Sequence, residues 1–176
     1  MAEGLCPFAG RPLARGEVRV VAGAFGVEAC LERLAAEADA LARDGEPDAA
    51  DAPTVLIAIA PGADGTTAVD ALDDFLDLVA LGEALLESLG HEGALQLASF
   101  HPDYAFDGVP AEDPANATNR APHPTLHLLR ESAVGAALAR HPDPHGIPER
   151  NVRHLRGLGS GGVARLLARI DEERTA

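Results

Sequence analysis

The chain of 176 residues contains no lysine and no tryptophan, and it has only one tyrosine and two cysteines. Without lysine, Schiff-base chemistry and the lysine of phosphate-binding P-loops are excluded. Aromatic residues make up only 3% of the chain, so a core must be built mainly from Ala, Leu and Val. Cys6 and Cys30 have the spacing of neither a disulfide framework nor a zinc site, which indicates a reducing compartment.

Long apolar runs are also absent. No stretch approaches the roughly 20 residues needed to span a bilayer, and no apolar signal core follows Met1. Apolar residues nevertheless make up 47% of the chain, which is enough for an ordinary core. We therefore expect a soluble, cytoplasmic protein with one domain over residues 1–176, including an irregular N-terminal arm (1–16) and a long functional loop (107–122).

Charge is distributed unevenly around a net value of −14. Up to Asp113 there are 5 arginines against 22 acidic residues. From Pro114 on there are 9 arginines against 6 acids, together with five of the seven histidines. The overall acidity argues against nucleic acid and membrane surfaces as partners. The basic final third is suited to a small anionic ligand, or it is a solvated helix face.

Short apolar runs alternate with stretches of helical periodicity. The apolar runs predict strands at 18–24, 54–60 and 94–100. Three- and four-residue spacing predicts helices at 27–42, 69–89, 124–139, 149–158 and 163–170. This order of strand, helix, strand, helix, strand, loop, helix and helix predicts an α/β (or α+β) fold, with helices packed on a small three- to four-stranded sheet. So thin a sheet is compatible with a missed edge strand or with a homodimer formed across a sheet edge.

Polar side chains follow the third predicted strand at the point where it ends. Ligands in open α/β sheets bind beyond the carboxyl ends of strands, so His101, Asp103 and Tyr104 stand at a favourable place. His101 is suited to acid/base chemistry near neutral pH, with Asp103 orienting its ring. The alternative is a turn in which Asp103 bonds the backbone and His101 is merely packed.

A second polar cluster follows the long loop. Asn119 and Arg120 precede a predicted helix start at Pro124, where a guanidinium and the helix dipole together suit a carboxylate or phosphate. Arg130, further along that helix, is a further candidate for binding an anionic substrate. Alternatively, Arg120 pairs internally with a loop acid such as Asp113.

The same predicted helix carries His123, His127 and Glu131 on one face. With His101 as a further nitrogen donor, His127 and Glu131 form a weak alternative metal site for Zn²⁺ or Fe²⁺. Two histidines alone are a poor metal signal, so no cofactor is predicted. We favour His127 as a catalytic residue without a metal, assisted by Arg130 on the adjacent turn.

Two further features have mainly structural explanations. Cys6 lies in the arm, and it is a candidate nucleophile with His101 as its base only if the arm folds over the site; otherwise it is an inert small hydrophobe. Cys30 belongs to the core. Residues 149–151 open the last helical region, where helix capping and an internal salt bridge of Arg150 suffice as an account.

Several segments of the chain resemble one family. These are residues 97–104 (LASFHPDY), 118–120 (TNR), 124–131 (PTLHLLRE) and 149–151 (ERN), together with the opening CPF at 6–8. Together they resemble the family named domain of unknown function 1415, found mostly in bacteria and in some plastid-bearing eukaryotes. The resemblance covers essentially the whole chain, and it implies no established activity.

Three functions fit these features. The first is a small-molecule enzyme acting on an anionic substrate, with His101, Asp103 and His127 as catalytic residues. Its substrate would be bound by Tyr104, Asn119, Arg120 and Arg130. The second is a non-catalytic ligand-binding or accessory protein that uses the same pocket, and the third is a non-haem metal-binding protein.

Overall fold

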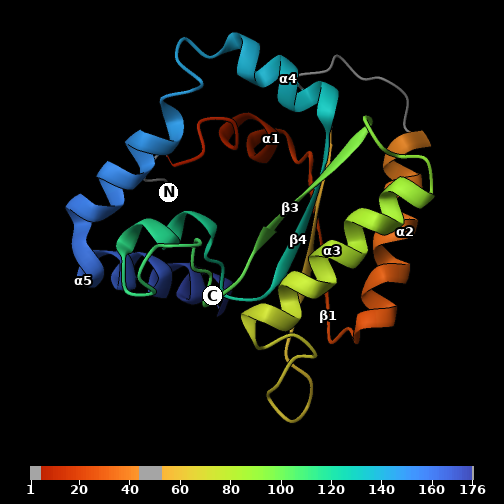
Figure 1. Cartoon of the computed structure of the whole chain (residues 1–176), viewed down its shortest axis with the longest axis horizontal. Coiled ribbons are helices and arrows are strands. Elements are labelled where there is room, and N and C mark those ends of the chain that lie inside the picture. Colours follow the sequence, from red (N-terminus) through yellow and green to blue (C-terminus); the bar gives the residue numbers. More distant parts are fainter. Residues whose placement is uncertain (1–4, 44–52, 176) are drawn as a thin grey trace.

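A computed structural model describes residues 5–43 and 53–175, and its centre is a four-stranded mixed sheet (Figure 1). The strands are β1 (Val18–Gly23), β2 (Thr54–Ile59), β3 (Leu95–Phe100) and β4 (Thr125–Arg130). Their spatial order is β1-β2-β4-β3, in which β1 and β2 run parallel and β4 is antiparallel to both of its neighbours.

Two long helices, α2 (Val27–Arg43) and α3 (Leu72–Ser88), cover one face of this sheet. Each helix buries a stripe of apolar side chains three or four residues apart, as an amphipathic helix does on a sheet. The stripe of α2 includes Leu34 and Leu41, and it packs with Phe75 of α3 against Val55 and Ile57 of β2. This layer forms the main hydrophobic core.

The remaining helices lie on the opposite side of the sheet (Figure 1). They are α1 (Gly10–Arg15), the 3-10 helix η2 (Pro114–Asn119), α4 (Glu131–Arg140) and α5 (Ile147–Thr175). A second, smaller core joins η2 to α5 through Ala117, Leu155 and Val163. Helix α5 is interrupted at Gly159, whose φ of 66° and ψ of 172° are not helical. No helix in the described part of the chain is long and apolar enough to cross a membrane.

The predicted fold class and the three predicted strands are confirmed, but the predicted helix at 124–139 is wrong in its first half. Residues 125–130 form β4, which lies inside the sheet, and α4 begins only at Glu131. Leu126 and Leu128 face the core, while His127 faces the other side of the sheet. This alternation is the two-residue period of a strand. The predicted order of elements therefore lacks one strand.

Two other segments are more regular than the sequence predicts. The arm expected to be irregular over 1–16 contains α1, although residues 1–4 lie outside the described part. The long loop at 107–122 contains η2, where the carboxylate of Asp113 caps the helix by accepting a hydrogen bond of 2.9 Å from the Ala115 N–H. The break expected between the predicted helices at 149–158 and 163–170 is present at Gly159.

Candidate functional site

His101 is buried at the end of β3, with 1% of its surface exposed. Its Nε2 lies 3.2 Å from the carbonyl oxygen of Val69, and its Nδ1 accepts a hydrogen bond of 3.1 Å from the backbone N–H of Asp103. The ring packs on Phe75 with a centroid distance of 5.2 Å. Both ring nitrogens are therefore engaged by the backbone, and it is the main chain of Asp103, with its side chain at the surface, that contacts the ring.

Arg120 holds the loop that follows His101 in place through two hydrogen bonds to backbone carbonyls. Its Nε donates to the carbonyl of Tyr104 at 3.0 Å, and its Nη2 donates to the carbonyl of Ala111 at 2.7 Å. The carbonyl of the neighbouring Asn119 accepts a hydrogen bond of 3.1 Å from the backbone N–H of His101. The structure thus brings His101, Tyr104, Asn119 and Arg120 together, but chiefly through backbone groups that shape a loop.

Two other polar side chains complete this loop, and the sequence did not single out either for this role. The buried amide of Asn116 accepts a hydrogen bond from the Phe106 N–H at 3.1 Å and donates to the Pro110 carbonyl at 2.8 Å. Asp113, considered above as a partner of Arg120, instead pairs with Arg156 at 2.7 Å. Hydrogen bonds from Arg156, and then from the Ala115 N–H, lower the pKa of Asp113 below its usual value.

His127 and Arg130 point to opposite faces of the sheet, because they are three residues apart in a strand. The Nε2 of His127 lies 2.6 Å from the hydroxyl oxygen of Thr54, which donates its own proton to the Leu128 carbonyl at 2.9 Å. Burial lowers the pKa of His127 from 6.5 to about 4, so the ring is neutral near neutral pH. Arg130 is buried on the helix-covered side, where its Nη2 donates to the Leu41 carbonyl.

The predicted metal set is not assembled on a common helix face, because His127 belongs to β4 and the exposed Glu131 begins α4. Within residues 5–43 and 53–175, no three His, Cys, Asp or Glu side chains are placed to hold a metal ion. Cys6 is an exposed free thiol, whereas Cys30 is fully buried as expected, and burial raises its pKa to about 11.

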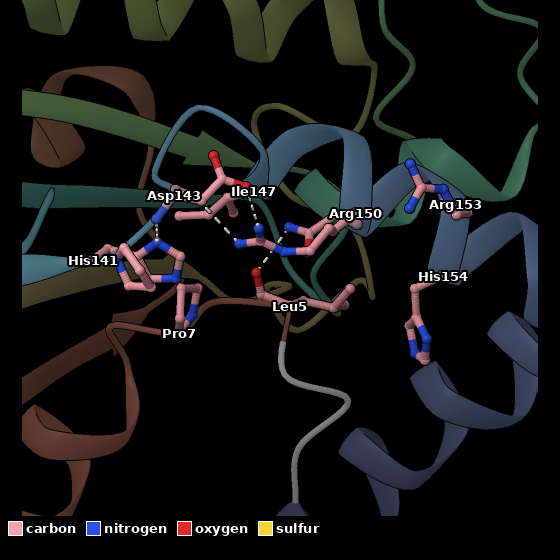
Figure 2. A pocket seen from close by; sticks show the side chains of 10 residues that line it. Leu5, Pro7, His141, Asp143, Ile147, Arg150, Arg153 and His154 are labelled. Carbon is pink, nitrogen blue, oxygen red and sulfur yellow. Dashed lines mark hydrogen bonds and ion pairs between the residues drawn. The ribbon is translucent and has the colours of Figure 1, made fainter.

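An open cleft of about 720 Å³ lies elsewhere, between the N-terminal arm, the turn after α4 and the first turns of α5. We call it the arm–helix cleft. It is lined by Leu5, Pro7, His141, Pro142, Asp143, Ile147, Arg150, Asn151, Arg153 and His154. Figure 2 shows Pro7 and His141 toward one end, Leu5 and Arg150 in the middle, and Arg153 and His154 toward the other end. The side-chain amide of Asn151 holds the arm in place by donating to the Leu5 carbonyl at 2.8 Å.

The charge of this cleft is opposite to that of the whole chain. Asp143 is the one acidic side chain among the described residues that line it, and that carboxylate is paired with Nη1 of Arg150 at 2.8 Å and also accepts a hydrogen bond from the Gly146 N–H at 3.1 Å. Arg153 and His154 line the same cleft, and Arg153 is exposed with no partner among the described residues. Because the Asp143 carboxylate is paired with Arg150, the positive charge of Arg153 is not balanced by a carboxylate among the described residues that line the cleft.

His141 begins a turn that repeats the local bond found at His101. The Nδ1 of His141 accepts a hydrogen bond of 3.1 Å from the backbone N–H of Asp143, two residues further on. In the neutral ring the proton is consequently on Nε2, which has no partner among the described residues. The edge of the ring packs against Phe8 with a centroid distance of 5.8 Å. The Nε2–H of His141 is thus available to a ligand, whereas the Nε2 of His101 is bonded to the Val69 carbonyl.

For residues 149–151 the sequence predicts a helix cap and an internal ion pair of Arg150. The ion pair of Arg150 is confirmed, with Asp143 as its partner. A signal for the cleft was nevertheless present. The segments at 6–8 and 149–151 both belong to the family resemblance, and the structure brings their neighbourhoods together through the bond from Asn151 to Leu5.

Comparison with known proteins identifies a family without a described activity. No curated protein and no solved structure matches the chain. The family model described as "Protein of unknown function (DUF1415)" matches residues 1–165, which is nearly the whole chain and agrees with the resemblance noted in the sequence. The chain therefore belongs to the DUF1415 family of proteins of unknown function.

Proposed function

We propose that the chain binds a small anionic molecule in the arm–helix cleft. The observation that carries this proposal is the contrast in charge. A chain with a net charge of −14 has a cleft lined by two arginines and two histidines, and Asp143, the carboxylate that lines it in the described part of the chain, is already paired. Its volume lies in the range of roughly 300–1,000 Å³ that is typical of small-molecule sites.

The side chains of this cleft suit a carboxylate or a phosphate. A guanidinium presents several N–H donors in a fixed plane and binds such groups through two parallel hydrogen bonds. Arg153 is available for this role, and Arg150 is held at the middle of the cleft by Asp143. The Nε2–H of His141 adds a neutral donor at the other end. Because the surrounding protein repels anions, local contacts of this kind supply the attraction.

This proposal keeps the chemistry expected from the sequence but uses different residues. The expected site combined a histidine, an aspartate and arginines, and the cleft repeats that combination in His141, Asp143, Arg150 and Arg153. The proposal does not use His101, because both of its ring nitrogens are bonded to the backbone. Binding an anionic ligand suits a small-molecule enzyme and a ligand-binding protein alike.

Calorimetric titration with phosphate, pyrophosphate and citrate at low ionic strength tests the proposal. We expect at least one of these anions to bind with a stoichiometry of one. The Arg153→Gln variant should bind it at least five-fold more weakly, which is of the order of one charge-assisted hydrogen bond. Arg43→Gln is the matched control, because Arg43 is exposed at the end of α2 on the opposite side of the sheet.

Two outcomes would contradict the proposal. One is the absence of millimolar or tighter binding for all three anions. The other is an equal loss of affinity in Arg153→Gln and Arg43→Gln, because an equal loss would mean that the anions respond only to the overall charge of the protein. Circular dichroism of both variants checks that they remain folded.

A further inference from the structure

A second hollow of about 210 Å³ adjoins the arm–helix cleft between α1 and α4. We call it the α1–α4 hollow. The two spaces share Pro7, His141 and Pro142 as lining residues, so they are neighbours. In Figure 2, Pro7 and His141 lie toward one end of the cleft, and the second hollow adjoins that end.

Among the residues that the structure describes, the α1–α4 hollow is lined by two arginines and by no acidic residue. One of them, Arg11, is exposed on α1 and has no partner among the described residues. The rest of the lining is mainly apolar and includes Phe8, Pro12 and Ala137. The hollow therefore combines a cationic group with apolar walls, which suits a hydrocarbon spacer that ends in a negative charge.

We propose that the ligand carries two anionic groups joined by a short apolar spacer, as in a linear dicarboxylate. One group lies in the arm–helix cleft beside Arg153, which is not paired with a carboxylate of the described residues, and the other lies beside Arg11. The spacer lies beside the ring of His141, and the Nε2–H of His141 donates to an oxygen of the anionic group in the arm–helix cleft. This inference rests on the proposed function, because the first anionic group is the one that the arm–helix cleft binds.

The shared position of His141 is the main argument for one ligand across both spaces. Its ring lines the cleft and the hollow at once, and the bond from the Asp143 N–H fixes its orientation. A single small anion such as phosphate would leave most of a 720 Å³ cleft filled with water. A longer dianion would contact arginines in both spaces and would bury the apolar walls of the hollow.

Titration by NMR with linear dicarboxylates of increasing length, from malonate through succinate, glutarate and adipate to suberate, tests this inference. Malonate is the charge-matched control, because it carries two negative charges with only one methylene group between them. We expect affinity to rise with length to an optimum that is at least ten-fold tighter than malonate. Arg11→Gln should remove about five-fold of that advantage, whereas Arg43→Gln should preserve it.

The possible failures are distinguishable. An affinity that is the same for malonate and for the longer diacids, or a length optimum that persists in Arg11→Gln, overturns the two-group ligand. Either result still allows the proposed function if Arg153→Gln weakens the binding of every diacid. If Arg153→Gln has no effect on any of them, the arm–helix cleft is not the anion site and both proposals fail.

Discussion

Asn151 donates a hydrogen bond of 2.8 Å from its side-chain amide to the carbonyl oxygen of Leu5, and so joins two parts of the chain that are 146 residues apart. This bond connects the second turn of α5 to the arm that precedes α1. Leu5 and Pro7 line the arm–helix cleft together with the residues of α5. The shape of the cleft therefore depends on a contact between the N-terminal arm and a residue near the C-terminal end of the chain.

We expect Asn151→Ala to release the arm and to lower the affinity for anions by roughly three-fold, because one wall of the cleft becomes mobile. The free energy of unfolding should fall by about 1 kcal/mol, the typical net value of one hydrogen bond. Urea denaturation and anion titration measure the two effects. Asn119→Ala is the matched control, because the contact of Asn119 with His101 uses its backbone carbonyl, which the substitution keeps. An equal loss of affinity in both variants would contradict the role of the arm.

The interruption of α5 predicts opposite effects for two glycines. Gly159 has a φ of 66° and a ψ of 172°, a conformation that is essentially restricted to glycine. Gly159→Ala should therefore reduce the free energy of unfolding by about 1–3 kcal/mol. Gly157→Ala should raise it by roughly 0.5–1 kcal/mol, because Gly157 is exposed in the helix and an added Cβ meets no atom within 4 Å. Thermal unfolding of the two variants gives the comparison, and equal effects would mean that α5 is continuous in solution.

The free energy of unfolding should fall as the pH is lowered from about 6.5 to about 4, because His127 stays unprotonated in the folded protein over this range. Burial lowers its pKa from 6.5 to about 4 in the folded protein. As the pH falls below 6.5, the unfolded chain takes up a proton that the folded chain does not, so the free energy of unfolding declines until about pH 4. The pKa difference corresponds to roughly 3 kcal/mol.

Urea denaturation of the wild type and of His127→Gln at several pH values from 7 to 4 isolates this contribution. Glutamine keeps an N–H donor near the Thr54 hydroxyl but does not titrate. The loss of stability between pH 7 and pH 4 should be smaller in this variant by about 3 kcal/mol. The exposed His145 supplies the control His145→Gln, whose pH profile should match that of the wild type. Parallel profiles for wild type and His127→Gln would show that His127 is accessible to protons in the folded state.

An element of the fold could be predicted from the sequence when its own residues carry the pattern that defines it, and could not be predicted when contacts with distant segments decide its structure. Strand β2 is a continuous apolar run, and α2 and α3 carry clear apolar stripes, so each was recognisable from its own residues. Strand β4 was mistaken for helix because Leu126 and Leu129 also fit helical spacing, and no glycine or proline separates Arg130 from α4. Its partners, β2 and β3, are distant in sequence, and only their pairing decides the matter.

The error in β4 also changed the candidate site. A helix would have placed His127 and Arg130 on neighbouring turns, whereas a strand directs them to opposite faces. The arm–helix cleft could not be found by the same reasoning, because it joins the arm to residues near 150. The sequence did indicate the chemistry, since arginine and histidine are concentrated after Pro114. It did not indicate where those side chains converge.

The two His-Pro-Asp turns of the chain supply the sharpest test of where the site is. In both turns the aspartate N–H donates to the histidine Nδ1 at 3.1 Å. In His101 the remaining nitrogen contacts the Val69 carbonyl in the core, whereas the ring of His141 lines both the arm–helix cleft and the α1–α4 hollow. The two histidines thus have the same local hydrogen bond, but one ring is buried in the core and the other lines open pockets. Substituting each in turn therefore compares a core position with a pocket position.

We expect His101→Ala to reduce the free energy of unfolding by about 3 kcal/mol, because it leaves a cavity against Phe75 and an unpaired carbonyl at Val69. Anion affinity of the protein that remains folded should change less than two-fold. His141→Ala should show the reverse, with a loss of stability below about 1 kcal/mol and a roughly five-fold loss of affinity. Urea denaturation and anion titration of both variants provide all four values. If His101→Ala abolished binding while His141→Ala preserved it, the site would lie at the end of β3, where the sequence first placed it, and not in the arm–helix cleft.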